Sequence, residues 1–136
     1  MTASIEPPLS DEALIAAFES TELPADRFTH AAHVRVAWYY LRSSPMLDAI
    51  LRFSRSLRRF AESKGVTTKY HETVTVAYLL IIRDRLEGAR ELTWPEFAER
   101  NPDLFERSPS ALARYYSDSL LASDRAREVF VLPDLP

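Results

Sequence analysis

Residues 70–87 are apolar on nearly every side when they are arranged as a helix, and they contain the longest unbroken apolar run of the chain, Val76 to Ile82. A helix with this pattern is typical of one that is surrounded by other helices. The run is far shorter than the roughly 18 residues that a membrane span requires. Strand-like alternation is scarce along the rest of the chain. We therefore predict an all-α fold, a single compact helical bundle with a central buried helix at about residues 69–87.

Capping signals and apolar periodicity predict the other helices. They lie at about residues 11–20, 30–42, 45–63, 94–100, 110–122 and 124–129. Ser10 and Thr29 are the expected N-caps of the first two, and Thr67 or Thr68 is the expected N-cap of the central helix. Gly65 is well placed to end the helix that precedes the central one.

Composition limits both the size of the core and the classes of function. The chain has 136 residues, of which 46% are hydrophobic, enough for one domain over residues 1–136 with residues 1–9 as a flexible arm. It has no cysteine and two glycines, which excludes disulfides, thiolate metal sites and glycine-rich phosphate loops. A net charge of −3 predicts no nucleic-acid or membrane partner. The N-terminus lacks the pattern of a secretory signal, so we expect a cytoplasmic protein.

All three histidines lie in two short segments, FTHAAHV at residues 28–34 and YHET at residues 70–73. Each segment begins a predicted helix, and helical periodicity directs the imidazoles inward. His30 and His33 are one turn apart, and His71 is a third candidate ligand from a neighbouring helix. Such a group favours a divalent transition metal, Zn, Fe, Ni or Cu, over Mg or Ca.

The neighbours of the histidines supply candidates for the other roles. Glu72 is a fourth ligand, an acceptor that orients an imidazole, or a general base, and Tyr70 is a proton donor. Tyr78, Tyr40 and Trp38 are the candidates for contacts with a small-molecule substrate, although aromatic residues at such spacings more often belong to a core.

Two other interpretations stay open. Buried histidines that hydrogen-bond to Tyr, Thr or Glu are commoner than metal ligands, so a metal-free site with Glu72 or a histidine as base fits the same residues. A non-catalytic helical module that binds a small ligand or a protein partner, with the histidines as structural anchors, fits them too. The nucleophile-elbow and HExxH motifs of hydrolases are absent from the sequence.

The FTHxxHV and YHET segments resemble those of a group of small uncharacterised bacterial proteins with no settled activity, over about residues 28–130. The resemblance implies only that His30, His33, His71 and Glu72 form one set. We therefore expect a small helical enzyme or enzyme-like protein, with an interior His/Glu site for a transition metal and a small polar substrate.

Overall fold

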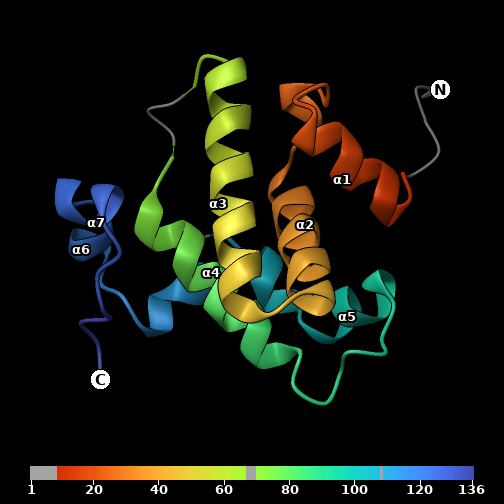
Figure 1. Ribbon diagram of the computed structural model, residues 1–136. Coiled ribbons are helices and arrows are strands. Elements are labelled where there is room, and N and C mark those ends of the chain that lie inside the picture. Colours follow the sequence, from red (N-terminus) through yellow and green to blue (C-terminus); the bar gives the residue numbers. More distant parts are fainter. Residues whose placement is uncertain (1–8, 67–69, 108) are drawn as a thin grey trace, which may run out of the picture.

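The computed structural model describes residues 9–66, 70–107 and 109–136 and confirms the all-α fold (Figure 1). Its elements are α1 (Asp11–Glu19), η1 (Ala25–Arg27), α2 (His30–Ser43), α3 (Met46–Ser63), α4 (Glu72–Arg85), α5 (Trp94–Arg100), η3 (Pro102–Phe105), η4 (Ala111–Arg114), α6 (Asp118–Leu121) and α7 (Asp124–Glu128). The expected arm, apart from Leu9, lies outside the described residues, as do Thr67 and Thr68.

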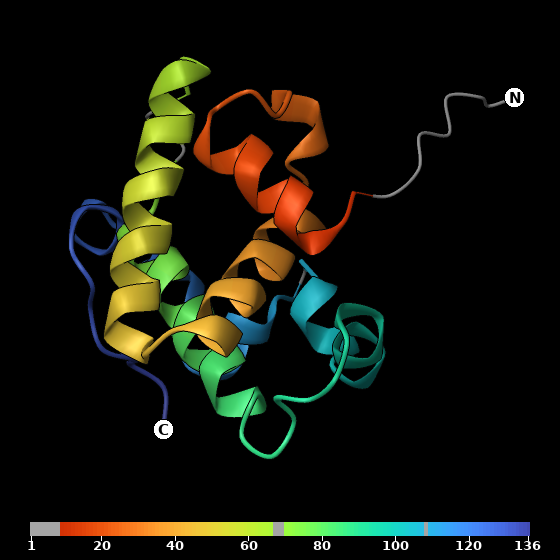
Figure 2. The same cartoon turned by 45° about the vertical axis from the view of Figure 1, so that its right-hand side comes forward.

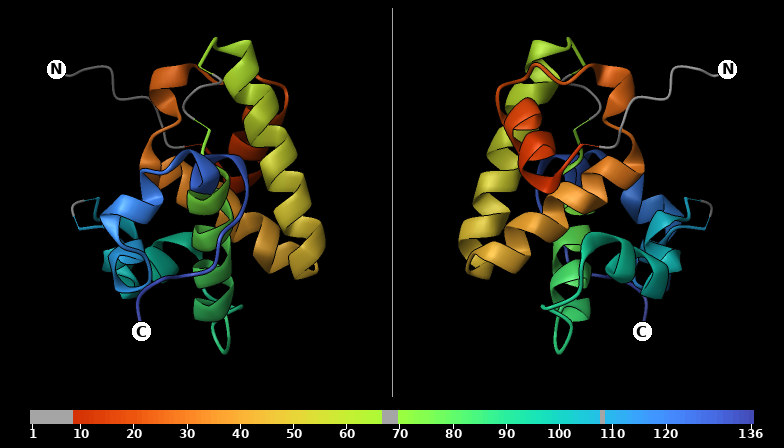
Figure 3. Two further views of the ribbon diagram at one scale, coloured as in Figure 1. Left: turned by 90° about the vertical axis from the view of Figure 1, so that its left-hand side faces the viewer. Right: turned by 90° about the vertical axis from the view of Figure 1, so that its right-hand side faces the viewer.

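Helix α4 lies at the centre, as predicted, with α2, α3, α7 and η4 packed against it. Helix α1 covers α2 and α3 on one side of the molecule, and α6 and α7 lie on the other side of α4 (Figures 1 and 2). The C-terminal segment runs along α4 in both views of Figure 3. Thr73 of α4 holds this segment by two hydrogen bonds. Its hydroxyl donates to the carbonyl of Val129 at 2.8 Å and accepts from the N–H of Val131 at 3.1 Å.

Side-chain caps place the helix starts. The Ser10 hydroxyl accepts from the N–H of Ala13, and the Thr29 hydroxyl accepts from the N–H of Ala32, as the sequence predicts. Gly65 follows α3 with a φ of +70°, a conformation that glycine adopts without strain. Helix α4 is shorter than expected, because its N-cap is His71 in an extended conformation.

The predicted helix at residues 110–122 is wrong, because η4 and α6 occupy this range with a break between them. Ser117 is extended at the break and caps α6, while its own N–H and hydroxyl donate to Asp134. Tyr116 is buried and donates to the carbonyl of Val131. These tertiary hydrogen bonds replace the helical ones that a continuous helix would have.

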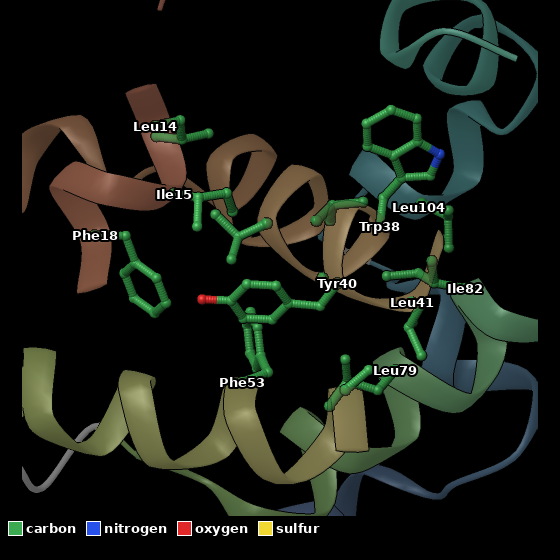
Figure 4. Packing of buried hydrophobic residues seen from close by; sticks show 14 of the residues in the cluster. Leu14, Ile15, Phe18, Trp38, Tyr40, Leu41, Phe53, Leu79, Ile82 and Leu104 are labelled. Carbon is green, nitrogen blue, oxygen red and sulfur yellow. The ribbon is translucent and has the colours of Figure 1, made fainter. Parts of the chain in front are cut away.

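Two expected substrate contacts, Trp38 and Tyr40, belong to the core. Both are fully buried on α2, and Figure 4 shows Tyr40 enclosed between α1 and α3. Its hydroxyl donates to Glu19. Trp38 packs against Trp94 and Phe97, and its indole N–H is buried without a hydrogen-bond partner in the described chain.

Candidate functional site

A cavity of about 490 Å³ lies where the first turns of α2 and α4 meet the second half of α3. Its lining includes all three histidines and Tyr70. The complete lining is Ala25, Phe28, Thr29, His30, His33, Leu57, Phe60, Ala61, Val66, Tyr70, His71, Val74, Thr75 and Arg107. We call this cavity the histidine pocket. The structure thus brings together the two histidine segments, 41 residues apart at His30 and His71.

A second cavity of about 80 Å³ adjoins the histidine pocket, and the two share five lining residues, including His30 and His33. It extends between α2, α3 and α4. The residues that line only this inner cavity are Val34, Ala37, Phe53, Tyr78, Leu79 and Ile82. Of the expected substrate contacts, Tyr78 therefore lies at the site, whereas Trp38 and Tyr40 are not among the lining residues of either cavity.

The imidazole ring of His33 lies at the pocket wall without a hydrogen-bond partner among the described residues. It stacks on Phe28 with ring centroids 3.9 Å apart. Burial, reinforced by His30 and Arg107, lowers its pKa from 6.5 to about 4. At neutral pH the imidazole is therefore uncharged, with one ring nitrogen that donates a hydrogen bond and one that accepts a hydrogen bond.

His30 is partly committed to the fold. Its Nε2 lies 2.8 Å from the carbonyl oxygen of Leu104, and since a carbonyl only accepts, Nε2 must carry the proton. The ring also meets the ring of Tyr78 edge to face at a centroid distance of 5.4 Å. These contacts hold the imidazole at the pocket wall and leave Nδ1 without a hydrogen bond among the described residues.

His71 is fully committed to the fold. Its Nδ1 accepts from the N–H of Val74 at 3.1 Å, and its Nε2 lies 2.7 Å from the carbonyl oxygen of Leu121, to which it donates. Both ring nitrogens are therefore in use. To bind a metal, His71 would have to give up its role as the N-cap of α4 or its bond to Leu121.

Glu72 pairs with Tyr70 and Arg58 and not with a histidine. Its Oε1 accepts from the Tyr70 hydroxyl at 2.5 Å and from Arg58 Nη2 at 3.1 Å. Burial and the neighbouring carboxylate raise the pKa of Tyr70 to about 12. The Glu72 charge is thus neutralised by Arg58, and Glu72 is not among the pocket's lining residues.

The expected three-histidine metal site is not supported. In the parts of the chain that the structure describes, no group of three or more His, Asp or Glu side chains is placed to hold a metal ion. Of the three expected histidine ligands, His30 and His33 keep a ring nitrogen without a partner among the described residues, whereas His71 does not.

Arg107 is a site residue that the sequence analysis missed. It lines the pocket beside His33, and its guanidinium has no ion-pair partner among residues 9–66, 70–107 and 109–136. No local pattern marks it, because the chain brings it to the pocket through η3, where the carbonyl of Leu104 anchors His30.

Comparison of the chain with protein-family models, with curated proteins and with solved structures gives no match. No helix among the described residues has the length and apolar character needed to span a membrane.

Proposed function

We propose that the histidine pocket binds a small polar organic molecule and that the neutral imidazole of His33 is the hydrogen-bonding partner of this molecule. The observation that carries the proposal is the state of His33. Its imidazole is neutral, lines a cavity and has no hydrogen bond within the described residues. His33 is half-buried, so its ring is open to a molecule that occupies the cavity.

The surroundings of His33 suit proton exchange with a ligand. Phe28 holds the plane of the ring by stacking, so a free ring nitrogen keeps its direction. Thr75 lines the same pocket, and so does Tyr70, whose hydroxyl donates to Glu72. General acid–base catalysis uses positioned imidazole groups, so the proposal includes an enzyme in which His33 exchanges a proton with the bound molecule.

The arrangement also favours a second candidate, a binding module without catalysis. His30 and His71 each hydrogen-bond a backbone carbonyl far away in the sequence, which is the behaviour of structural anchors. In this candidate the pocket holds its ligand without converting it. Turnover of a bound molecule distinguishes the two.

A divalent transition metal, Zn, Fe, Ni or Cu, is a further candidate occupant, favoured by the one-turn spacing of His30 and His33 at one wall. These two residues would supply the protein ligands, and the other coordination positions would remain for water or substrate. Metal analysis of untagged protein, with the His33→Leu variant as comparison, tests this form of the site.

The test of the proposed function is a screen of small polar molecules by NMR, with the ring resonances of His33 as readout. We expect some molecules to shift these resonances, and the His33→Leu variant to lose their binding. The Arg55→Gln variant is the control, because Arg55 is exposed on α3 and lies outside the pocket. Molecules that bind both His33→Leu and the wild-type protein equally well would overturn the proposal, as would a broad library without any effect on His33.

A further inference from the structure

The histidine pocket is electropositive. No aspartate, glutamate or lysine is among its lining residues, and Arg107 is the one arginine there. The guanidinium of Arg107 has no carboxylate partner in the described chain, unlike Arg35, Arg52 and Arg85, each of which pairs with an acid. An unpaired guanidinium at a cavity wall is available to a ligand carboxylate or phosphate.

The helix starts add to this field. Helices α2 and α4 have 14 residues each, and their first turns line the pocket through Thr29, His30 and His71. The first turn of a helix carries partial positive charge from its unpaired N–H groups. No acidic residue lies in the first turn of α2, and the one in the first turn of α4, Glu72, is paired with Arg58.

The other end of the site is apolar. The inner cavity begins at His30 and His33 and continues between side chains such as Val34, Phe53 and Leu79. A molecule that reaches from Arg107 past His33 into this space therefore meets first a cation, then a neutral imidazole and then hydrocarbon.

Resting on the proposed function, we propose that the pocket selects a small carboxylic acid with an apolar body. The carboxylate lies between Arg107 and His33 at the helix starts, and the apolar body enters the inner cavity. A free inorganic anion would use only the first half of this arrangement, and a neutral apolar molecule would use only the second.

The same arrangement links binding to proton uptake. The aromatic, titratable and charged groups that line the pocket with His33 are Phe28 before α2, His30 on the same helix, Tyr70 and His71 before α4, and Arg107 after η3. The charged form of His33 is disfavoured by burial and by its cationic neighbours. A carboxylate beside the ring would reverse part of this effect and raise the pKa of His33. Carboxylate affinity should then increase as the pH falls from 7 towards 5.

Matched ligands test the inference on the full chain. Isothermal titration calorimetry and His33 resonances are measured with benzoate and benzamide, with hexanoate and hexanamide, and with acetate. We expect each larger acid to bind about tenfold more tightly than its amide, and acetate to bind about tenfold more weakly than benzoate, since each loses one of the two interactions.

Two variants that each remove one positive charge show whether the preference for carboxylates depends on Arg107. Arg107→Gln should reduce benzoate affinity to that of benzamide and leave benzamide binding unchanged, whereas Arg55→Gln on the outer face of α3 should change neither. Equal affinities for acids and amides, or an unaffected Arg107→Gln variant, overturn the inference while the pocket itself stands. Failure of both benzoate and hexanoate to shift the His33 ring also overturns it. The proposed function fails separately, when no molecule of the wider library reaches His33.

Discussion

The two helices that begin with a histidine segment, α2 and α4, are capped by different kinds of side chain. At the start of α2 the hydroxyl of Thr29 caps the helix, so neither His30 nor His33 is needed as the cap. At the start of α4 the cap is the imidazole of His71, and its second nitrogen donates to Leu121. In this chain the ring of His33 is without a hydrogen bond among the described residues because Thr29 fills at α2 the capping role that His71 fills at α4.

The largest expected effect is on the pH dependence of stability and concerns the α2 segment. The pKa of His33 is about 4 in the folded protein against 6.5 ordinarily. Between these values the unfolded chain binds a proton at His33 that the folded protein does not, so stability falls as the pH falls. Above pH 6.5, His33 does not lower the free energy of unfolding. Below pH 4, it lowers the free energy of unfolding by about 3 kcal/mol.

Urea unfolding of the wild type and of His33→Leu, measured from pH 7 to pH 4, checks this expectation. Leucine does not titrate, so the variant should lose less stability over the interval, and the difference isolates His33 from the carboxylates. Parallel curves for the two proteins would show that His33 takes up a proton in the folded state as easily as in the unfolded chain.

His71→Ala tests the α4 segment. The variant loses the N-cap of α4 and the hydrogen bond to Leu121, and we expect a destabilisation of about 2 kcal/mol. His71→Asn should recover about half of this, because asparagine is a good N-cap but does not reach Leu121. Unfolding midpoints in urea give both values. A His71→Ala variant as stable as the wild type would remove the contrast between the two segments.

His30→Ala should have a smaller effect, a destabilisation of about 1 kcal/mol, because one hydrogen bond is lost and the carbonyl of Leu104 is left without its donor. His33→Leu at pH 7 is the matched comparison, since it breaks no hydrogen bond of the described chain. Thermal melts of the two variants should therefore separate, with His33→Leu closer to the wild type. The reverse order would mean that His33, not His30, is the structural histidine of α2.

Glu72→Gln should have the smallest effect. The Glu72 side chain pairs with Arg58, which is 55% exposed, and pairs of this kind contribute about 0.5 kcal/mol. The glutamine oxygen still accepts from the Tyr70 hydroxyl. Since Glu72 is not among the pocket's lining residues, ligand affinity should not change, and calorimetry with benzoate checks this. A loss of binding would restore the base or ligand role that the sequence suggests for Glu72.

Sequence patterns predicted much of this fold because the signals are local. The caps at Ser10 and Thr29, the end of α3 at Gly65 and the all-round apolar character of α4 each depend on neighbouring residues alone. The cap of α4 escaped prediction because histidine is an uncommon cap, and threonines stood nearby. The break before Ser117 escaped it because Asp134 and Val131, far along the chain, stabilise it.

The site was harder to predict for the same reason. Helical periodicity places His30 and His33 on an inward face, but the carbonyls of Leu104 and Leu121, which engage two of the three histidines, belong to distant turns. Every residue has a backbone carbonyl, so the residue types in the sequence do not indicate which carbonyls bind a histidine. Arg107 likewise reaches the pocket only through the path of the backbone after η3.

The placement of the two tryptophans has a consequence for spectroscopy. Trp38 and Trp94 lie 5.5 Å apart between ring centroids, and neither lines the histidine pocket or its inner cavity. Intrinsic tryptophan emission therefore samples one locality of the molecule. Trp38 is wholly enclosed, and its N–H has no partner in the described chain, so its emission should be blue-shifted and should move to the red when the core is lost. A ligand in the histidine pocket should not change this emission. An unfolding curve recorded by tryptophan fluorescence would therefore report the loss of the core whether or not a ligand is bound.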